Sequence, residues 1–381
     1  MERALDGIRV LDLTDVKGAW ATKLLADLGA DVVRVEPPGG DAMRTLGPFY
    51  RDQPGADRSL TYWFYNTSKR AITLDLAAQE GRASLLRLAS ESDILVESAA
   101  MGYLDGLGLG YTEVARSAPG LIYVSITPFG RSGPLASSPA TDLTLSAMGG
   151  MMHVTGNRET PPLVAFGQQT YHVGAHFGAI NALAALRGRR ASGRGQLIDV
   201  SIEASVAAFI EHVNMWYLYS GRLAKRQGSL HWSSAFKTFR ASDGYVCISF
   251  FHQWEFLVAW LLSEDAADDL ANEQYLDRRW AVRHLDHIIE VVGRWVSGKT
   301  VEELFREGQQ RRFPWAPVHT IEQLLGVPQL RERDYWTPVV HDELGATFEY
   351  PGAPYRLSAS PWAISRRPPL HDEHTREVLG G

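Results

Sequence analysis

The regular alternation of strand-like and helix-like segments near the amino terminus is the sequence feature that most constrains the fold. Ile8–Leu13 is a short apolar run with β-branched residues, Ala19–Leu28 has apolar residues at helical spacing, and Asp31–Val35 is rich in valine. Strand, helix and strand within so short a span predict a βαβ unit with parallel strands. The pattern recurs in the predicted strands 71–76, 94–97 and 121–127 and in the predicted helix 80–89. The first part of the chain is therefore expected to form an open α/β sheet.

Three loops of this expected sheet follow strand ends. They are Pro37–Gly40, Ser98–Ala100 and Thr127–Gly130. Ligands of open α/β sheets bind outside the carboxyl ends of the strands. We therefore expect the functional site to lie among these loops.

The next part of the chain carries small residues at helical spacing. From His176 to Leu186, Ala, Gly and apolar residues recur without proline, which predicts a helix packed closely against another surface. Ser192–Gly195 cannot continue that helix, and Gln196–Ile202 alternates as a strand or the entry to a further helix would. The apolar, aromatic-rich segment Ala204–Tyr219 is expected to be one long helix that leads out of the first domain.

A second, smaller domain is expected beyond that helix. Phe236–Phe251 resembles a hairpin that turns at Ser242–Gly244, and helical stretches follow through Glu302–Glu307. This pattern is typical of an α+β domain. The Pro-containing segment Phe313–Pro317 marks the return of the chain.

Composition excludes several classes of protein. The chain has 381 residues, a formal net charge of −6 and no basic cluster beyond Arg187–Arg194, which argues against nucleic acid as a partner. A single cysteine, Cys247, excludes an intrachain disulfide and fits a reducing cytoplasm. Because there is neither an apolar signal segment nor a run of about eighteen apolar residues, we expect a cytoplasmic protein without a membrane span.

Several ordered motifs carry a family resemblance that covers essentially the whole chain. They are GIRVLDLT, LLADLGADVVRVEPPGGD, NTSKRAITLDL, YVSITPFGRSGP, ATDLTLSAMGGMMHVTG and GRGQLIDVSIEAS. With these motifs the chain resembles the class III CoA transferases, the family of formyl-CoA and carnitine-CoA transferases. The resemblance implies an α/β fold with a large Rossmann-like open-sheet domain and a smaller α+β domain. It implies that residues 1–220 form the large domain, 225–308 the small one, and that 309–381 return to the first. It also implies an interlocked dimer with active sites near the interface.

The family reaction needs a carboxylate at one particular place. A nucleophile that accepts an acyl group as an anhydride and then carries CoA as a thioester must be Asp or Glu. The family places this Asp shortly after the glycine of the turn, here Gly167, and before the Ala-rich helix. Counting forward from Gly167 gives His172, and counting back from the helix gives Tyr171. Neither is a carboxylate, and the sequence has no Asp or Glu from 161 to 197.

His172 and Tyr171 therefore remain as candidate catalytic residues with two interpretations. His172 could act as a general acid or base or form a transient acyl-imidazole, although an imidazole cannot carry CoA as a thioester. Alternatively, both residues fill and hydrogen-bond a site whose nucleophile has been lost. His172 and His176 are four residues apart and could share a helix face as metal ligands, but no third ligand stands at a suitable spacing. We predict no metal site.

The resemblance also implies which residues contact CoA. They are Val16, Lys17, Leu74, Asp75, Leu76, Ala77, Ser98 and Ala99. Two positions at which many members have a basic residue are Pro37 and Gly106 here, which removes potential charged partners of the CoA phosphates. The cations that could replace them are Lys17, Arg34, Lys69 and Arg70.

These features lead to three hypotheses on function. The first is a CoA-transferase family protein that acts in transfer of CoA between organic acids as the non-catalytic subunit of a two-subunit enzyme. The second is a self-sufficient acyl-CoA isomerase or lyase that uses His172 as acid or base, and the third is a non-catalytic CoA-binding scaffold. The expected partners are a CoA thioester, a small organic acid and either a second copy of the chain or a related catalytic subunit, with neither nucleic acid nor membrane.

Overall fold

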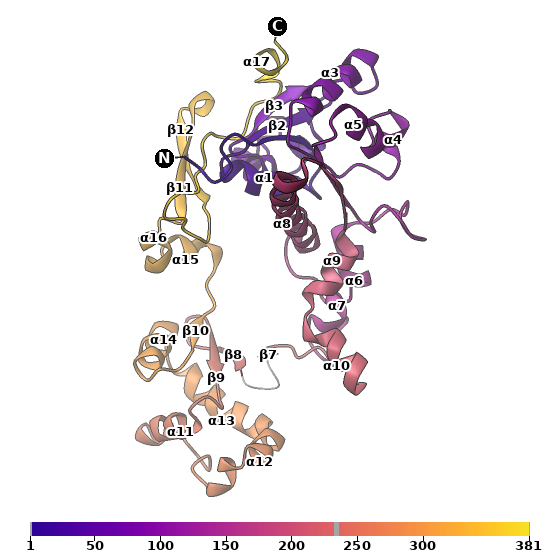
Figure 1. Ribbon diagram of the computed structural model, residues 1–381. Helices are drawn as coiled ribbons and strands as arrows, with labels where there is room; N and C mark the ends of the chain where they lie inside the picture. The colour runs from indigo at the N-terminus through magenta and orange to yellow at the C-terminus, as the bar shows by residue number, and fades with distance from the viewer. Residues whose placement is uncertain (1, 232–235, 381) are drawn as a thin grey trace. The chain divides into compact units, whose positions relative to one another are not determined.

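The computed structural model describes residues 2–231 and 236–380, which form two compact units (Figure 1). The larger unit consists of Met1–His153, Val164–Ala224 and Glu332–Gly381. The smaller unit consists of Val154–Leu163 and Lys225–Arg331. The larger unit is thus assembled from three separate stretches of chain.

A six-stranded parallel sheet organises the larger unit. Its spatial order is β3-β2-β1-β4-β5-β6, and every neighbouring pair is parallel. The strands are β1 (Arg9–Leu13), β2 (Asp31–Glu36), β3 (Arg70–Thr73), β4 (Ile94–Glu97), β5 (Ile122–Thr127) and β6 (Leu197–Ser201). The predicted open α/β sheet is confirmed.

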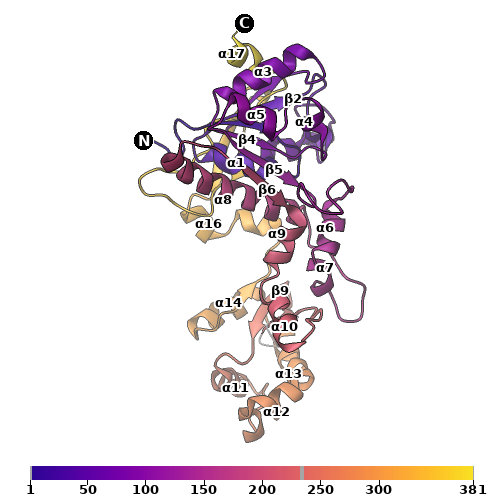
Figure 2. The same cartoon turned by 45° about the vertical axis from the view of Figure 1, so that its right-hand side comes forward.

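Alternating residues of the strands pack against helices on the two faces of this sheet. Val10 belongs to a buried cluster with α1 (Ala19–Asp27) and α8 (Gln169–Ser192), whereas its neighbour Leu11 belongs to a cluster with α3 (Gln79–Ser90) and α5 (Tyr111–Ser117). Figure 2 shows α8 and α3 on opposite sides of the sheet. Because successive side chains of a strand point to opposite faces, both faces of this parallel sheet are covered.

Helix α8 lies very close to its neighbours. A Cβ at Gly174 would lie 2.8 Å from the Ile202 side chain, and a Cβ at Gly178 would lie 2.7 Å from Ile126 Cδ1. The predicted close packing is therefore confirmed. The helix is longer than predicted, since it begins at Gln169 and runs for 24 residues. It ends where Gly193 adopts a left-handed conformation, as the Gly-rich turn predicts.

The single long helix predicted over Ala204–Tyr219 is wrong. The segment forms two helices, α9 (Ile202–Phe209) and α10 (His212–Ser220). The chain breaks between them at Glu211, whose φ is +50°. A non-glycine residue in this region is uncommon, and neither Gly nor Pro marks the break in the sequence.

The remaining elements of the larger unit are short. They are η1 (Ala42–Thr45), η2 (Tyr50–Asp52), α2 (Leu60–Tyr65), α4 (Tyr103–Gly106), α6 (Asp142–Met148), α7 (Met151–Val154), β11 (Trp336–His341), η4 (Asp342–Leu344), β12 (Ala346–Pro351) and α17 (Thr375–Leu379). The antiparallel pair β11–β12 packs on α2 through Val339 and Tyr350. The backbone N–H of Thr73 in β3 donates to the hydroxyl of Thr375 at 2.9 Å, which joins α17 to the edge of the sheet.

The smaller unit combines an antiparallel sheet with helices. The sheet has the order β10-β9-β8-β7, with β7 (Leu230–His231), β8 (Phe236–Arg240), β9 (Tyr245–Ser249) and β10 (Ala316–Pro317). The helices are α11 (Trp254–Ser263), η3 (Glu273–Leu276), α12 (Arg278–Arg283), α13 (Leu285–Ser297), α14 (Val301–Gln310), α15 (Ile321–Leu325) and α16 (Pro328–Glu332), the last ending at the boundary of the unit. The predicted hairpin is confirmed, because β8 and β9 pair antiparallel around Ser242–Gly244.

Candidate functional site

A cleft opens at the carboxyl ends of β1 to β4, where the sequence predicts the site. Its volume is about 290 Å³. Six of the eight predicted CoA contacts line it, namely Leu74, Asp75, Leu76, Ala77, Ser98 and Ala99. The other lining residues are Leu13, Thr14, Asp15, Val35, Glu36, Pro37, Pro38, Asp41, Tyr103 and Leu104. The structure thus brings together loops that are far apart in the sequence.

Val16 and Lys17, the other two predicted CoA contacts, lie in the loop after β1 but do not line the cleft. The carboxylate of Asp15 accepts a hydrogen bond from the Lys17 backbone N–H at 2.9 Å and pairs with the Lys17 ammonium group. Asp15 also accepts a hydrogen bond from the Ser98 hydroxyl at 2.7 Å. These contacts hold the loop after β1 against the loop after β4.

The cations that could meet CoA phosphates are already paired with carboxylates. Lys17 pairs with Asp15, and Arg70 pairs with Asp31 and Glu377. Arg34 and Lys69 are fully buried, and both donate to Asp12, at 3.0 and 2.8 Å. Burial alone would lower the pKa of Arg34, but Asp41 and Asp12 hold that pKa well above its usual value. Because these cations are buried and already paired, they offer little to a ligand.

A second centre lies at the start of α8. Asp142, the first residue of α6, accepts hydrogen bonds from the backbone N–H of Thr170 at 2.9 Å and from its hydroxyl at 2.7 Å. A carboxylate beside unpaired N–H groups stabilises the first turn of a helix. This turn carries both predicted catalytic positions, Tyr171 and His172.

His172 is held by aromatic residues from two other helices. Its Nε2 lies 2.7 Å from the hydroxyl of Tyr65 in α2, and its ring stacks on Trp20 of α1 with centroids 5.1 Å apart. The Trp20 indole N–H donates to Nε2 of His176 at 3.2 Å, and Nδ1 of His176 lies 2.8 Å from the His172 carbonyl oxygen. The two histidines therefore share a helix face and are linked through Trp20.

Burial determines the protonation states of His172 and Tyr65. It lowers the pKa of His172 below its usual value, and the neighbouring His176 acts in the same direction against an opposing effect of Asp142. Burial, with a smaller effect of Asp142, raises the pKa of Tyr65 to about 12. At neutral pH the imidazole of His172 is therefore uncharged and the phenol of Tyr65 keeps its proton.

Tyr171 points to a different environment. It is buried in the cluster beneath α8, together with Ala175 and Ile202. Burial raises the pKa of its hydroxyl. The two candidate catalytic residues thus lie on different faces of α8, and His172 is the one that borders a cavity.

The cavity beside His172 has a volume of about 520 Å³. Its lining is mostly apolar and consists of Met151, Ala165, Gln169, His172, Val173, His176, Phe177, Ile180 and Phe209. None of these side chains is a carboxylate, a lysine or an arginine. Most lie on the outward face of α8, which leaves His172 as a polar group in an apolar wall.

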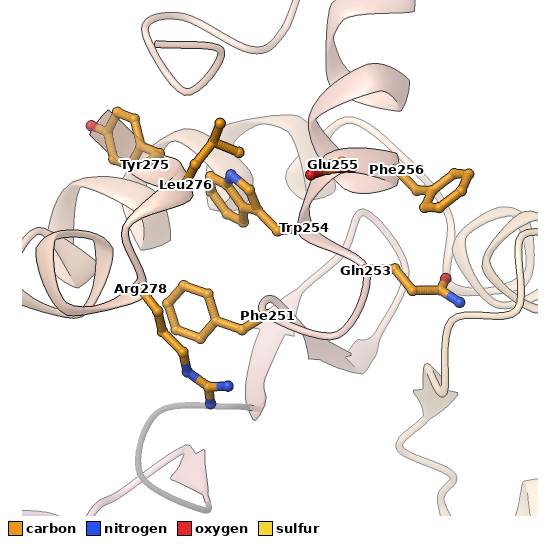
Figure 3. Close-up of a pocket in the computed structure, with 8 residues that line it drawn as sticks. All are labelled: Phe251, Gln253, Trp254, Glu255, Phe256, Tyr275, Leu276 and Arg278. Carbon is orange, nitrogen blue, oxygen red and sulfur yellow. The ribbon is translucent and has the colours of Figure 1, made fainter. Parts of the chain in front are cut away.

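The smaller unit has a separate cavity of about 310 Å³, shown in Figure 3. Phe251, Trp254 and Tyr275 form an aromatic wall, and the guanidinium carbon of Arg278 lies 5.6 Å from the centre of the Phe251 ring. This cavity contains none of the predicted site residues.

Within residues 2–231 and 236–380, no group of three or more His, Cys, Asp or Glu side chains is arranged to hold a metal ion. In the same part of the chain, no helix is both long and apolar enough to cross a membrane.

The chain belongs to the family described as CoA-transferase family III, which it matches over residues 5–375. The resemblance seen in the motifs is therefore confirmed. A solved structure of a CAIB/BAIF family protein from Brucella suis superposes with a TM-score of 0.91 and 28% identity, covering 99% of each chain. The predicted class III CoA-transferase fold, with its Rossmann-like sheet and smaller α+β unit, is confirmed with it.

Curated relatives with similar sequences are CoA transferases that act between organic acids. The chain is 36% identical to the succinyl-CoA:(R)-benzylsuccinate CoA-transferase subunit BbsE of Thauera aromatica, over 97% of this chain and 92% of that protein. It is 32% identical to a succinyl-CoA:mesaconate CoA-transferase of Haloarcula hispanica, over 99% of this chain and 96% of that protein.

The sequence motifs did not point to Tyr65 or Trp20. Both lie more than a hundred residues before His172, in segments where an aromatic residue is equally typical of a core. Tyr65 directly precedes the family motif that begins at Asn66, and this position is the one signal that could have drawn attention to it.

Proposed function

We propose that this chain acts in the transfer of CoA between organic acids as one subunit of a two-subunit transferase. The observation that carries this proposal is the position of His172. It stands in the first turn of α8, where the family resemblance puts the nucleophilic carboxylate, and no Asp or Glu occurs from 161 to 197. A related chain would supply the carboxylate. The similarity to BbsE, which is itself named as a subunit, supports this assignment.

In this proposal the cleft at the strand ends holds the nucleotide part of a CoA thioester. Leu74 to Ala77 form one wall and Ser98 with Ala99 another, and Asp15, which the Lys17 backbone N–H contacts, also lines the cleft. Apolar side chains and backbone groups of these loops suit an adenine ring. Because the nearby cations are paired within the chain, the phosphates would meet solvent or the partner.

Exposed apolar residues on the larger unit support assembly with a second chain. Phe166 is 99% exposed, and Leu218 and Tyr219 of α10 are 70% and 80% exposed. Large exposed apolar side chains favour an interaction site where they lie together on the surface. We infer an interlocked dimer, either of two copies or of this chain with a related catalytic subunit, that works in the cytoplasm.

Calorimetric titration of the purified protein with CoA and succinyl-CoA, combined with native mass measurement, tests the proposal. We expect a dimer that binds CoA reversibly and transfers CoA between acids when a related chain with the carboxylate is present. Transfer by the chain alone, with CoA bound covalently to it, would contradict the subunit assignment.

A further inference from the structure

The apolar cavity beside His172 contains few polar groups that could contact a ligand. The side-chain amide N–H of Gln169 donates to the carbonyl of Phe166 at 2.9 Å. Nε2 of His176 accepts from Trp20, and Nδ1 of the same ring faces the His172 carbonyl, so this Nδ1 carries the proton. Both ring nitrogens of His176 therefore have partners within the chain, which leaves His172 as the polar group of the lining that could contact a ligand.

The hydrogen bond to Tyr65 determines which nitrogen of His172 carries a proton. Within the described residues, Nε2 of His172 is the hydrogen-bond partner of the Tyr65 hydroxyl, at 2.7 Å. If Nε2 carried the proton, this largely buried hydroxyl would have no acceptor, which is unfavourable. Tyr65 therefore donates to Nε2, and the uncharged ring carries its proton on Nδ1. Nδ1 has no partner among the described residues.

This tautomer gives His172, a residue that lines the cavity, one N–H donor without a partner among the described residues. The lone pair on Nε2 is occupied by Tyr65, so the ring has no free base to abstract a proton from a ligand in the cavity. An N–H group in an apolar wall instead favours an acceptor oxygen, such as that of a carboxylate or a thioester. Trp20 stacks on the ring and fixes its orientation.

The other side chains of the lining limit which substituents an acid bound through that oxygen can carry. Val173, Phe177, Ile180 and Phe209 offer apolar contact, and the volume of about 520 Å³ exceeds what a short acid needs. A second carboxylate would find no cationic partner in this lining and would displace water from apolar side chains without compensation. An aryl or long alkyl substituent would be well accommodated.

We propose that His172, held as a neutral Nδ1–H donor by Tyr65, binds the carboxyl or thioester oxygen of an organic acid that carries an aryl-sized apolar substituent. The inference rests on the proposed function for the identity of the ligand as an acid substrate. Tyr65 and Trp20 are positioning residues in this arrangement. The cavity thus selects acids by the apolar group that they carry.

The first test reads the tautomer and does not depend on activity. In protein labelled with ¹⁵N-histidine, we expect His172 to show a protonated Nδ1 and an unprotonated Nε2, with the assignment made by loss of the signal in His172→Asn. In Tyr65→Phe we expect a shift toward the Nε2–H form. An Nε2–H signal in the unmodified protein, or no change in Tyr65→Phe, would overturn the proposal.

The second test compares ligands and variants by calorimetry on the protein as purified, together with any chain that accompanies it. We expect 3-phenylpropanoate to bind at least tenfold more tightly than propanoate or succinate. His172→Asn places an amide N–H near the position of Nδ1 and should keep binding within about threefold, whereas His172→Ala should lose about tenfold, the cost of one hydrogen bond. Equal loss in both variants, or equal binding of all three acids, would contradict the inference.

CoA titration of the same samples separates this inference from the proposed function. Binding of CoA without preference for the aryl acid would overturn the cavity inference and leave the transferase proposal intact. Binding of the aryl acid with the expected tautomer, but without CoA binding in any assembly, would keep the acid site and remove the transferase proposal.

Discussion

At the scale of single residues, the absence of Asp and Glu from positions 161 to 197 is the sequence feature on which the proposed subunit role rests. A carboxylate can carry CoA as a thioester and an imidazole cannot. Counting forward from Gly167 gives His172 for this carboxylate position, and counting back from the Ala-rich helix gives Tyr171. In the structure Tyr171 is buried beneath α8, whereas His172 lines the cavity. We therefore propose His172 as the residue at this position.

We predict that His172→Asp creates a chain that can be loaded covalently with CoA. After incubation with succinyl-CoA, intact-mass analysis should show an adduct of CoA on this variant and none on the unmodified chain. The matched control is Tyr171→Asp, which buries a charge under α8 and should lower stability without forming an adduct. An adduct on Tyr171→Asp, but not on His172→Asp, would reverse the assignment of the position.

The protonation of His172 gives a prediction about pH. Burial holds the pKa of His172 below its ordinary value, and the charged or titratable groups around it are Tyr65, His176 and Asp142. Above pH 7 the ring is neutral, so a neutral donor should bind 3-phenylpropanoate equally well from pH 7 to 8.5. Below its lowered pKa the ring gains a positive charge, and binding of the anion should strengthen. A donor that needed the imidazolium form would instead lose affinity about tenfold per pH unit above its pKa. Calorimetry in buffers of constant ionic strength checks this.

At the scale of secondary structure elements, the sequence predicts most strands and helices. It does not predict where α8 begins or where the chain breaks between α9 and α10. The parallel strands and the α8 helix follow from periodicity, and Gly193 marks the end of α8. The start of α8 at Gln169 depends on Asp142, 28 residues away from Thr170, and the break at Glu211 carries no local signal. Likewise, motif comparison found His172, whereas the contact with Tyr65 arises only when α2 packs against α8.

Two glycines of α8 give a matched prediction about packing. Gly178→Ala places a Cβ 2.7 Å from Ile126 Cδ1 and should lower the free energy of unfolding by about 1 to 3 kcal/mol. Gly188→Ala is the control in the same helix, since a Cβ there meets nothing within 4 Å, and should raise stability by about 0.5 to 1 kcal/mol. Urea unfolding followed by circular dichroism measures both. Equal effects of the two changes would mean that α8 does not pack as tightly as described.

At the scale of the whole molecule, the exposed apolar side chains of α10 bear on whether this chain associates with a second one. Exposed apolar side chains of α10 have no packing role within the larger unit, since none of its residues is buried. Such a surface is typical of a chain that functions together with another.

We predict that Leu218→Asp shifts the protein toward a smaller assembly. The side chain is 70% exposed in the single chain, and a carboxylate would be buried without a partner if another chain covered it. Size-exclusion chromatography with light scattering should show a lower mass, while circular dichroism stays unchanged. Leu218→Met, which keeps an apolar side chain, should leave the mass as it is. An unchanged mass for Leu218→Asp would show that α10 lies outside the interface.

The assembly of the larger unit from three stretches also bears on how the protein is made. Tyr62 and Trp63 of α2 are buried partly by Val339 and Tyr350, which belong to the last fifth of the chain. Because synthesis proceeds from the amino terminus, the ribosome completes the whole smaller unit before it adds Val339 and Tyr350. During that interval Tyr62 and Trp63 lack the part of their covering that comes from Val339 and Tyr350. In a chain truncated near residue 331 these two aromatic side chains would stay uncovered, and we expect that chain to be degraded faster than the full chain.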